Sequence, residues 1–252
     1  MSRVIGVLSG KGGVGKTTIV ANLGTSLTYD FRRSIAILDG NITASHLGLH
    51  LGLYGDMPVT LKNVIENNAP IASSMFIHPE TGVRCLPAPL DGKIRKISKF
   101  SRAVNKLKKT YDIVIMDCAP GLGRDVVMGA KMIDQAIIVT TPEIPSATDS
   151  LKTVTLLHRL KKEVLGIVLN RVKNKKYELT VGEIESTCGC KVISVIPEDD
   201  KVPESISKGM PVTFSYPNSL AAVELKKLAA RLVGESYTPP GFLYKLKRIF
   251  GH

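Results

Sequence analysis

The residues with the clearest chemical meaning lie near the amino terminus, where the segment GKGGVGKT occupies residues 10–17. Its glycines allow successive backbone N–H groups to turn towards one point, where they can wrap a chain of phosphates. A helix that begins at the end of such a loop directs its positive end at the same point. Lys16 can then neutralise charge on the terminal phosphates, and the Thr17 hydroxyl can ligate Mg²⁺. The segment therefore predicts a site for a nucleoside triphosphate and magnesium.

Apolar runs of strand length alternate with segments of helical period along most of the chain. The runs that predict strands are residues 4–8, 35–38, 113–116, 136–139, 165–169 and 192–196. Residues 16–29 are predicted to form the helix that follows the glycine loop. Two later stripes have helical spacing: Ile94, Ile97, Phe100, Val104 and Leu107, and then Leu151, Val154, Leu157 and Leu160. This alternation predicts one α/β domain whose mostly parallel sheet carries helices on both faces, in three layers.

Polar residues follow several of these strands directly. Asp39 and Asp117 each come straight after a short apolar run, and Asn170 follows another. In an open parallel sheet, ligands bind beyond the carboxyl ends of the strands, which is where these residues are expected to lie. An aspartate at a strand tip can hold a water on Mg²⁺, and both aspartates are placed for this role.

The glycine loop also carries a lysine, Lys11, directly after its first glycine. The run KGGVGKTT at residues 11–18 resembles the deviant Walker A motif of the MinD/ParA class of P-loop ATPases. The resemblance implies nucleotide contacts from Gly10, Lys11, Gly12, Gly13, Val14, Gly15, Lys16, Thr17 and Thr18. It also implies a homodimer with ATP, in which Lys11 reaches the partner's phosphates and joins Lys16 in stabilising the transferring phosphoryl group. Without the resemblance, Lys11 could be a solvated loop lysine.

Later segments extend the resemblance along most of the chain. The run IAILD at residues 35–39 is similar to the start of the class's switch I, and IVIMDCAPG at residues 113–121 is similar to its Walker B strand and switch II. The resemblance implies that Thr17, Asp39 and Asp117 serve the magnesium ion. Segments LNR and IPED are similar to its adenine-side loops. They imply that ATP or ADP contacts Asn170, Arg171, Pro197, Glu198 and Asp199, with Asn170 on the purine edge.

Switch I departs from the usual pattern of the class at one position. The class has Asp-x-Asp there, and its second aspartate positions the attacking water, whereas this chain has Asp39-Gly40-Asn41. Asparagine cannot accept a proton, although its carbonyl oxygen can still orient a water. Asn41 therefore predicts an ATPase that hydrolyses slowly, or an ATP-gated scaffold that barely hydrolyses.

The carboxyl-terminal residues 241–251 form a second distinctive segment, GFLYKLKRIFG. Helical spacing brings five apolar side chains to one face: Phe242, Leu243, Leu246, Ile249 and Phe250. Basic residues lie towards the other face, which is typical of a helix on a membrane surface. The segment resembles the membrane-targeting sequence of the MinD class. The alternative is a last helix that docks on its own domain.

These segments divide the chain into an ATPase domain (1–234), a linker (235–240) and a membrane-targeting helix (241–251). Nothing resembles a secretory signal, and no uncharged apolar run reaches about 18 residues. We therefore expect a cytoplasmic protein with reduced thiols, peripheral on the inner, anionic face of the cell membrane. The resemblance implies spatial regulation, such as placement of the division site or of surface machinery, together with an activating or cargo protein.

The formal net charge of +12 allows further partners. Eight basic residues crowd the stretch from 93 to 109, and this stretch could bind DNA through its phosphates, as in a ParA-like partition ATPase. The lack of Trp and the few other aromatic residues disfavour base stacking, and a membrane tail makes DNA binding a weaker hypothesis. The alternative without a binding partner is a solvated helix face whose charge keeps the protein soluble.

The cysteines leave one metal hypothesis open. Cys188 and Cys190 could hold a metal as a pair across a dimer, but two thiolates are too few for a closed site within one subunit. A related iron–sulfur carrier of the Mrp type has C-x-x-C near the carboxyl terminus, and this chain has only C-x-C. We expect a turn between a helix and a strand instead.

Overall fold

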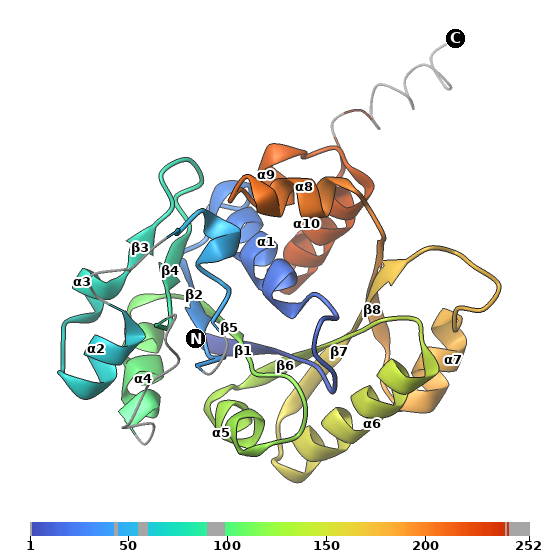
Figure 1. Ribbon diagram of the computed structural model, residues 1–252, viewed down its shortest axis with the longest axis horizontal. Coiled ribbons are helices and arrows are strands. Elements are labelled where there is room, and N and C mark those ends of the chain that lie inside the picture. Colours follow the sequence, from blue (N-terminus) through green and yellow to red (C-terminus); the bar gives the residue numbers. More distant parts are fainter. Residues whose placement is uncertain (1, 43–44, 55–59, 90–98, 240, 242–252) are drawn as a thin grey trace.

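The computed structural model describes residues 2–42, 45–54, 60–89, 99–239 and 241. An eight-stranded sheet has the order β3-β4-β2-β5-β1-β6-β7-β8 (Figure 1). The strands are β1 Arg3–Leu8, β2 Ile35–Asp39, β3 Phe76–Ile77, β4 Arg84–Leu86, β5 Ile113–Asp117, β6 Gln135–Thr140, β7 Glu163–Val172 and β8 Val192–Pro197. All pairings are parallel except that of β3 with β4.

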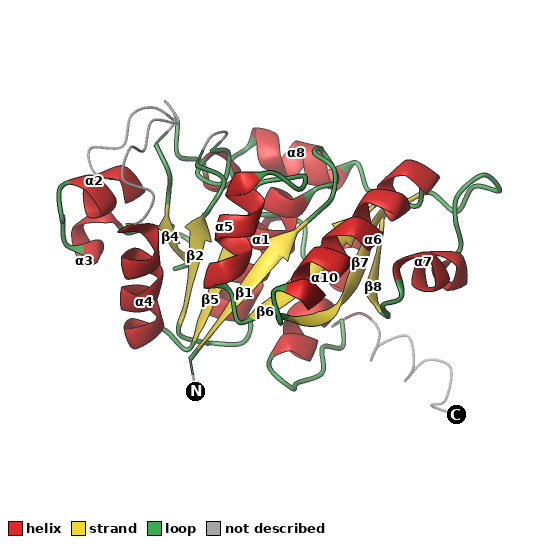
Figure 2. Cartoon of the chain, turned by 90° about the horizontal axis from the view of Figure 1, so that it is seen from below, coloured by secondary structure: helices red, strands yellow, loops and turns green. Residues whose placement is uncertain are grey.

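Helices cover both faces of this sheet, which confirms the predicted three-layer α/β architecture (Figure 2). The helical segments are α1 Lys16–Tyr29, η1 Leu49–Leu51, α2 Leu61–Glu66, α3 Ile71–Ser74, α4 Phe100–Thr110, α5 Arg124–Met132, α6 Ile144–Arg159, α7 Val181–Cys188, α8 Lys201–Ser207, α9 Val212–Ser215 and α10 Leu220–Leu232. Helices α1 and α10 pack on one face, and α4, α5, α6 and α7 pack on the other.

Strand alternation explains the two cores. Successive side chains of a strand point to opposite faces of the sheet. Thus Val4 and Leu8 of β1 join the core under α4 to α6, whereas Ile5 and Val7 join the core under α1 and α10. All of them are fully buried, so the central strand is apolar on both sides, as parallel strands covered by helices must be.

The apolar stripes are partly as predicted. Phe100, Val104 and Leu107 are buried on α4, while Ile94 and Ile97 lie outside the described residues. On α6, Val154 and Leu157 are buried, but Leu151 is 39% exposed, so this member of the predicted stripe does not lie on the buried face. The buried face of α6 is rotated from the predicted stripe and includes small side chains such as Ala147 and Ser150, which hydropathy alone does not mark.

The chain after α10 stays in contact with the body of the domain. Glu235 pairs with Arg33 after α1, and the ring of Tyr237 lies 5.5 Å from the Nζ atom of Lys226 on α10. Lys226 is buried and forms a 2.8 Å ion pair with Asp30. The predicted tail residues Phe242, Leu243, Leu246, Ile249 and Phe250 lie outside the described part of the chain. Within the described part, no helix is long and apolar enough to span a bilayer.

Candidate nucleotide-binding site

The glycine loop connects β1 to α1 at the carboxyl edge of the sheet. Gly15 precedes the helix with φ at 99°, a left-handed conformation that only glycine adopts readily. Gly10 is needed for a different reason, because a Cβ atom there would lie 2.2 Å from the carbonyl oxygen of Asp149 on α6. The loop is thereby packed tightly against α6.

Side chains on either side of the loop hold it in shape. Ser9, fully buried, donates a 2.6 Å hydrogen bond to the carbonyl of Lys11 and accepts one of 3.0 Å from the Lys16 Nζ atom. Lys16 is 7% exposed, and burial lowers the pKa of its ammonium group. A buried cation is costly unless an anion accompanies it, so this position is suited to a phosphate. The sequence places Ser9 among the polar residues that follow predicted strands, but it does not predict these two hydrogen bonds.

Asp39 and Asp117 are register partners at the ends of the neighbouring parallel strands β2 and β5. Asp39 is fully buried and accepts hydrogen bonds from the Ser45 hydroxyl (2.6 Å) and the Asn41 main chain (3.0 Å). Burial, with the charge of nearby Asp117, raises the pKa of Asp39 to about 7. Burial also raises the pKa of Asp117 to about 6, although its hydrogen bond from Thr17 opposes this shift.

This arrangement fits a magnesium ion. The Thr17 hydroxyl donates a 2.6 Å hydrogen bond to Oδ2 of Asp117, while Oδ1 of Asp117 is buried and has no hydrogen-bond partner among the described residues. An unsatisfied buried carboxylate oxygen is costly, and a cation or its bound water would satisfy it. Mg²⁺ prefers oxygen ligands and keeps several waters, so two carboxylates, a hydroxyl and phosphate oxygens suffice.

A cavity of about 220 Å³ opens beside the glycine loop. Its lining includes seven predicted nucleotide contacts, which are Gly15, Thr18, Asn170, Arg171, Pro197, Glu198 and Asp199. Ile196, the first residue of the predicted IPED segment, also lines it, and five apolar residues that were not predicted from the sequence complete it: Ile19, Val202, Pro203, Ile206 and Leu225. An apolar hollow with a few polar groups at its edge suits a purine ring.

Asn170 joins this cavity to the glycine loop. Its Nδ2 group donates a 2.8 Å hydrogen bond to the Val14 carbonyl, which uses one of its two N–H donors, and Oδ1 can accept from a purine amino group. The next residue, Arg171, has φ at 59°, so the chain turns sharply after Asn170. Contact of Asn170 with a purine edge stays a prediction.

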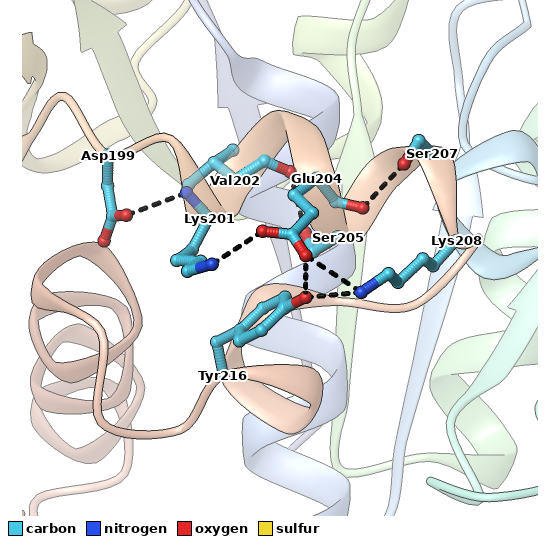
Figure 3. A network of polar contacts seen from close by, with 8 residues as sticks. All are labelled: Asp199, Lys201, Val202, Glu204, Ser205, Ser207, Lys208 and Tyr216. Carbon is cyan, nitrogen blue, oxygen red and sulfur yellow. Dashed lines mark hydrogen bonds and ion pairs between the residues drawn. The ribbon is translucent and has the colours of Figure 1, made fainter.

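Asp199 organises the far wall of the cavity. One of its carboxylate oxygens accepts from the Lys201 main chain at the start of α8 (2.9 Å), and the other accepts from the Ala221 main chain at the start of α10 (3.0 Å). Figure 3 shows Asp199 at the beginning of α8, whose outer side carries Lys201, Glu204 and Lys208 around the ring of Tyr216. The Asp199 side chain therefore supports the wall. Contact of Pro197, Glu198 and Asp199 with a base stays a prediction.

Lys11 lies on the exposed side of the loop. Its Nζ atom is 3.8 Å from Oε2 of Glu143, the residue before α6, and both side chains are at least half exposed. Exposed pairs of this kind contribute little, so Lys11 can exchange Glu143 for another anion at small cost. Asn41 is half-buried beside Asp39, and its role towards water stays a prediction.

Cys188 and Cys190 flank the expected turn between a helix and a strand. Cys188 is buried at the end of α7, Gly189 ends the helix in the left-handed conformation, and Cys190 leads into β8. Among the described residues, no group of three or more His, Cys, Asp or Glu side chains could hold a metal ion. A metal site shared across a dimer stays an untested alternative.

Comparison with known proteins agrees with this geometry. A ParA family model, described as an NUBPL iron-transfer P-loop NTPase, matches residues 1–233. An uncharacterized ATP-binding protein of Methanocaldococcus jannaschii is 38% identical, over 94% of this chain and 90% of that protein. The septum site-determining protein MinD of Thermotoga maritima is 31% identical, over 93% and 89% of the two chains.

A solved structure has the same fold and is similar in sequence. The septum site-determining protein MinD of Pyrococcus horikoshii, complexed with Mg-ADP, superposes with a TM-score of 0.84 at 30% identity and covers 92% of this chain and 96% of that one. Both the fold and the sequence similarity therefore extend along almost the whole chain. The chain belongs to the MinD/ParA family of P-loop ATPases.

Proposed function

We propose that this protein binds Mg·ATP in the site between the glycine loop and α8 and hydrolyses it slowly. One observation carries the proposal: Asp117 binds Thr17 through Oδ2 and lies near the buried cation of Lys16, while its buried Oδ1 atom has no partner among the described residues. Mg²⁺ supplies charge neutralisation at the phosphates when bound. Lys16 and the loop N–H groups hold the phosphates, and the apolar cavity beside Asn170 holds the base and excludes water from it.

The second part of the proposal is an ATP-dependent homodimer. The exposed Lys11 makes a long contact to Glu143 that it can give up at small cost, so it is available to a second copy of the chain. A cation supplied by the partner makes dimerisation depend on the triphosphate and makes hydrolysis depend on the dimer. The expected behaviour of Lys11→Ala is therefore ATP binding without dimerisation and with little hydrolysis.

The third part is reversible attachment to an anionic membrane through residues 241–251. Five apolar side chains at about 2 kcal/mol each give roughly 10 kcal/mol gross. Ordering some ten residues costs about as much, and three basic residues near an anionic leaflet add about 1 kcal/mol each. One tail therefore binds weakly. Two tails on a dimer bind together, and effective concentration raises avidity about 10²–10⁴-fold.

We infer a role in positioning, as the names of the septum site-determining relatives suggest for those proteins. In this role the nucleotide state sets how long the protein resides on the membrane, and a partner protein that stimulates hydrolysis or is itself positioned reads that state.

The experiment has three stages. Calorimetry measures Mg·ATP binding to the wild type and to Asp117→Ala, for which binding is expected to fall at least about tenfold. Size-exclusion chromatography with light scattering then measures mass with ATP and with ADP, for wild type and Lys11→Ala. Co-sedimentation with vesicles of phosphatidylglycerol and phosphatidylethanolamine compares the full chain with one that ends at residue 240.

The outcomes separate the alternatives. ATP-dependent dimers that pellet with vesicles only when residues 241–252 are present support the whole proposal. A wild type that takes up no Mg·ATP and stays monomeric overturns it at the first stage. ATP-dependent binding to duplex DNA without vesicle binding would instead identify a partition-type ATPase, with the exposed basic side chains of α4 as the first candidates for phosphate contacts.

A further inference from the structure

Helix α8 forms one wall of the base cavity but is too short to hold its own position. It has seven residues, Lys201–Ser207, and isolated helices of that length are not stable in water. Val202, Pro203 and Ile206 line the cavity, whereas Lys201, Glu204 and Lys208 follow the opposite side at helical spacing. Together with the Asp199 bonds at the start of α8 and the packing of Val202 on the core, the contacts of that outer side therefore set how closely α8 approaches a bound base.

The outer side of α8 is fastened to the residue that ends α9. The Tyr216 hydroxyl donates a hydrogen bond to Glu204, and Glu204 also accepts from Lys201 (2.7 Å) and Lys208 (2.9 Å) (Figure 3). The two lysine ammonium groups lie 4.8 and 5.1 Å from the centre of the Tyr216 ring. Isolated ion pairs that are partly exposed contribute little to stability, but a network of several charges around one aromatic ring contributes more.

Helix α9 is in turn tied to α1, on which the phosphate site is built. The Thr213 main chain and hydroxyl donate to Oδ1 of Asn22, at 2.9 and 3.0 Å, and Asn22 donates a 2.8 Å bond to the Thr18 carbonyl. Asn22 and Thr213 are each 2% exposed. The position of α9 is therefore fixed relative to the first turn of α1, so it offers a rigid support for α8.

We propose that Glu204 and Tyr216 are positioning residues for the nucleotide base, acting as a clamp that holds α8 against α9 and thereby sets the width of the base cavity. The clamp favours an unsubstituted purine and rejects a purine that carries a bulky group. This inference rests on the proposed function, because it requires the base to lie in the cavity lined by α8. Neither residue is among those that line the cavity, so both act through α8.

The test measures calorimetric affinities for three magnesium complexes: ATP, ATP with a benzyl group on its exocyclic amino nitrogen, and inorganic tripolyphosphate. The variants are Tyr216→Phe, which keeps the ring and removes the hydroxyl, Glu204→Ala, and Glu204→Gln, which keeps an acceptor. Glu224→Gln is the matched control, because Glu224 forms a comparable 2.8 Å pair with Lys227 on α10, and neither residue lines the cavity.

In Tyr216→Phe and Glu204→Ala we expect ATP to bind about fivefold more weakly. The effect is moderate because only part of the free energy lost with a hydrogen bond to a charged group affects binding of the base. Tripolyphosphate affinity should stay within about twofold of the wild type, and the preference for ATP over benzyl-ATP should fall about tenfold. Glu204→Gln should recover part of the loss. Tyr216→Phe should have a smaller effect in the Glu204→Ala background than in the wild type, because only the hydrogen bond from Lys208 to the Tyr216 hydroxyl then remains to be lost.

Two results overturn the clamp. An unchanged ATP to benzyl-ATP preference in Tyr216→Phe and Glu204→Ala shows that the width of the cavity does not depend on these residues. An equal loss for ATP and tripolyphosphate shows general destabilisation instead of base positioning. A wild type that binds no Mg·ATP overturns the proposed function and the clamp together, whereas either result above, in a wild type that binds, overturns the clamp alone.

Discussion

The side-chain amide of Asn170, at the carboxyl end of β7, donates a 2.8 Å hydrogen bond to the main-chain carbonyl of Val14 in the glycine loop. The two residues are 156 positions apart in sequence, and Asn170 is 8% exposed. A Cβ atom on Gly15 would lie 2.3 Å from the same amide nitrogen. The base side of the cavity and the phosphate loop are therefore one packed unit, so a change in either should affect both.

Asn170→Ala tests this unit. The substitution leaves the buried Val14 carbonyl without its donor, and we expect about 1–3 kcal/mol lower free energy of unfolding and about tenfold weaker Mg·ATP binding. Urea unfolding and calorimetry measure the two effects. Asn105→Ala, on the exposed side of α4, is the control and should change neither. We also expect weaker binding of tripolyphosphate, because the hydrogen bond from Asn170 ends on the phosphate-binding glycine loop itself.

Gly10→Ala should be poorly tolerated for a steric reason. The new methyl group meets the main chain of Asp149 on α6, which cannot move without displacing the helix. Overpacking of this kind costs about 1–3 kcal/mol in unfolding free energy, and the distorted loop should bind Mg·ATP weakly. Gly182→Ala is the matched control, since Gly182 lies within α7 and a Cβ atom there would meet nothing within 4 Å, and it should be neutral or stabilising. Equal stability of the two variants would contradict the packing argument.

The raised pKa of Asp39 predicts how stability without nucleotide depends on pH. Because native Asp39 keeps its proton up to about pH 7, against 3.8 for an ordinary aspartate, the native state binds more protons in this interval. The stabilisation that comes from protonated Asp39 is fully present below the pKa of this group in the unfolded state. It is lost as pH rises through the pKa of the group in the folded state, and the free energy of unfolding then falls by up to about 1.4 kcal/mol per pH unit. Asp39→Asn should therefore lose less stability than the wild type between pH 5 and pH 7.

Urea unfolding in EDTA at a series of pH values measures this dependence. The difference between the slopes reports Asp39 and its coupling to Asp117, because the remaining titrating groups are shared by the two proteins and an overall offset in stability leaves the slopes unchanged. Asn105→Ala removes an exposed side chain that does not titrate and should leave the slope as in the wild type. Parallel curves for wild type and Asp39→Asn would show that the buried carboxyl does not titrate in this range.

Asn41→Asp should raise the steady-state ATPase rate. The carboxylate can accept a proton and orient the attacking water, which the amide does only in part, and a positioned base is worth about 10²–10⁴-fold in favourable cases. We expect at least about a tenfold increase at saturating Mg·ATP. Asn41→Ala serves as the comparison and should lie at or below the wild-type rate. A rate for Asn41→Asp that is unchanged or lower would remove position 41 from the hydrolytic step.

The parts of this site that depend on local structure could be predicted from the amino-acid sequence. A glycine loop between a strand and a helix has few ways to fold, because its backbone conformations require glycine at fixed positions. Asp39 and Asp117 were placed correctly at strand ends because polar residues after short apolar runs must lie at the edge of a parallel sheet. The fold class follows from the same alternation of strand and helix.

The side chains that support these groups became apparent only from the packing of distant segments. The bonds from Asn170 to Val14 and from Ser45 to Asp39, and the wall formed by α8, join segments whose sequences carry no sign of one another. The exposure of Leu151 was likewise set by where α6 rests on the sheet. Periodicity predicts that a helix has an apolar face, but the packing of neighbouring elements fixes its rotation, and such long-range contacts arise from the summed burial of many side chains.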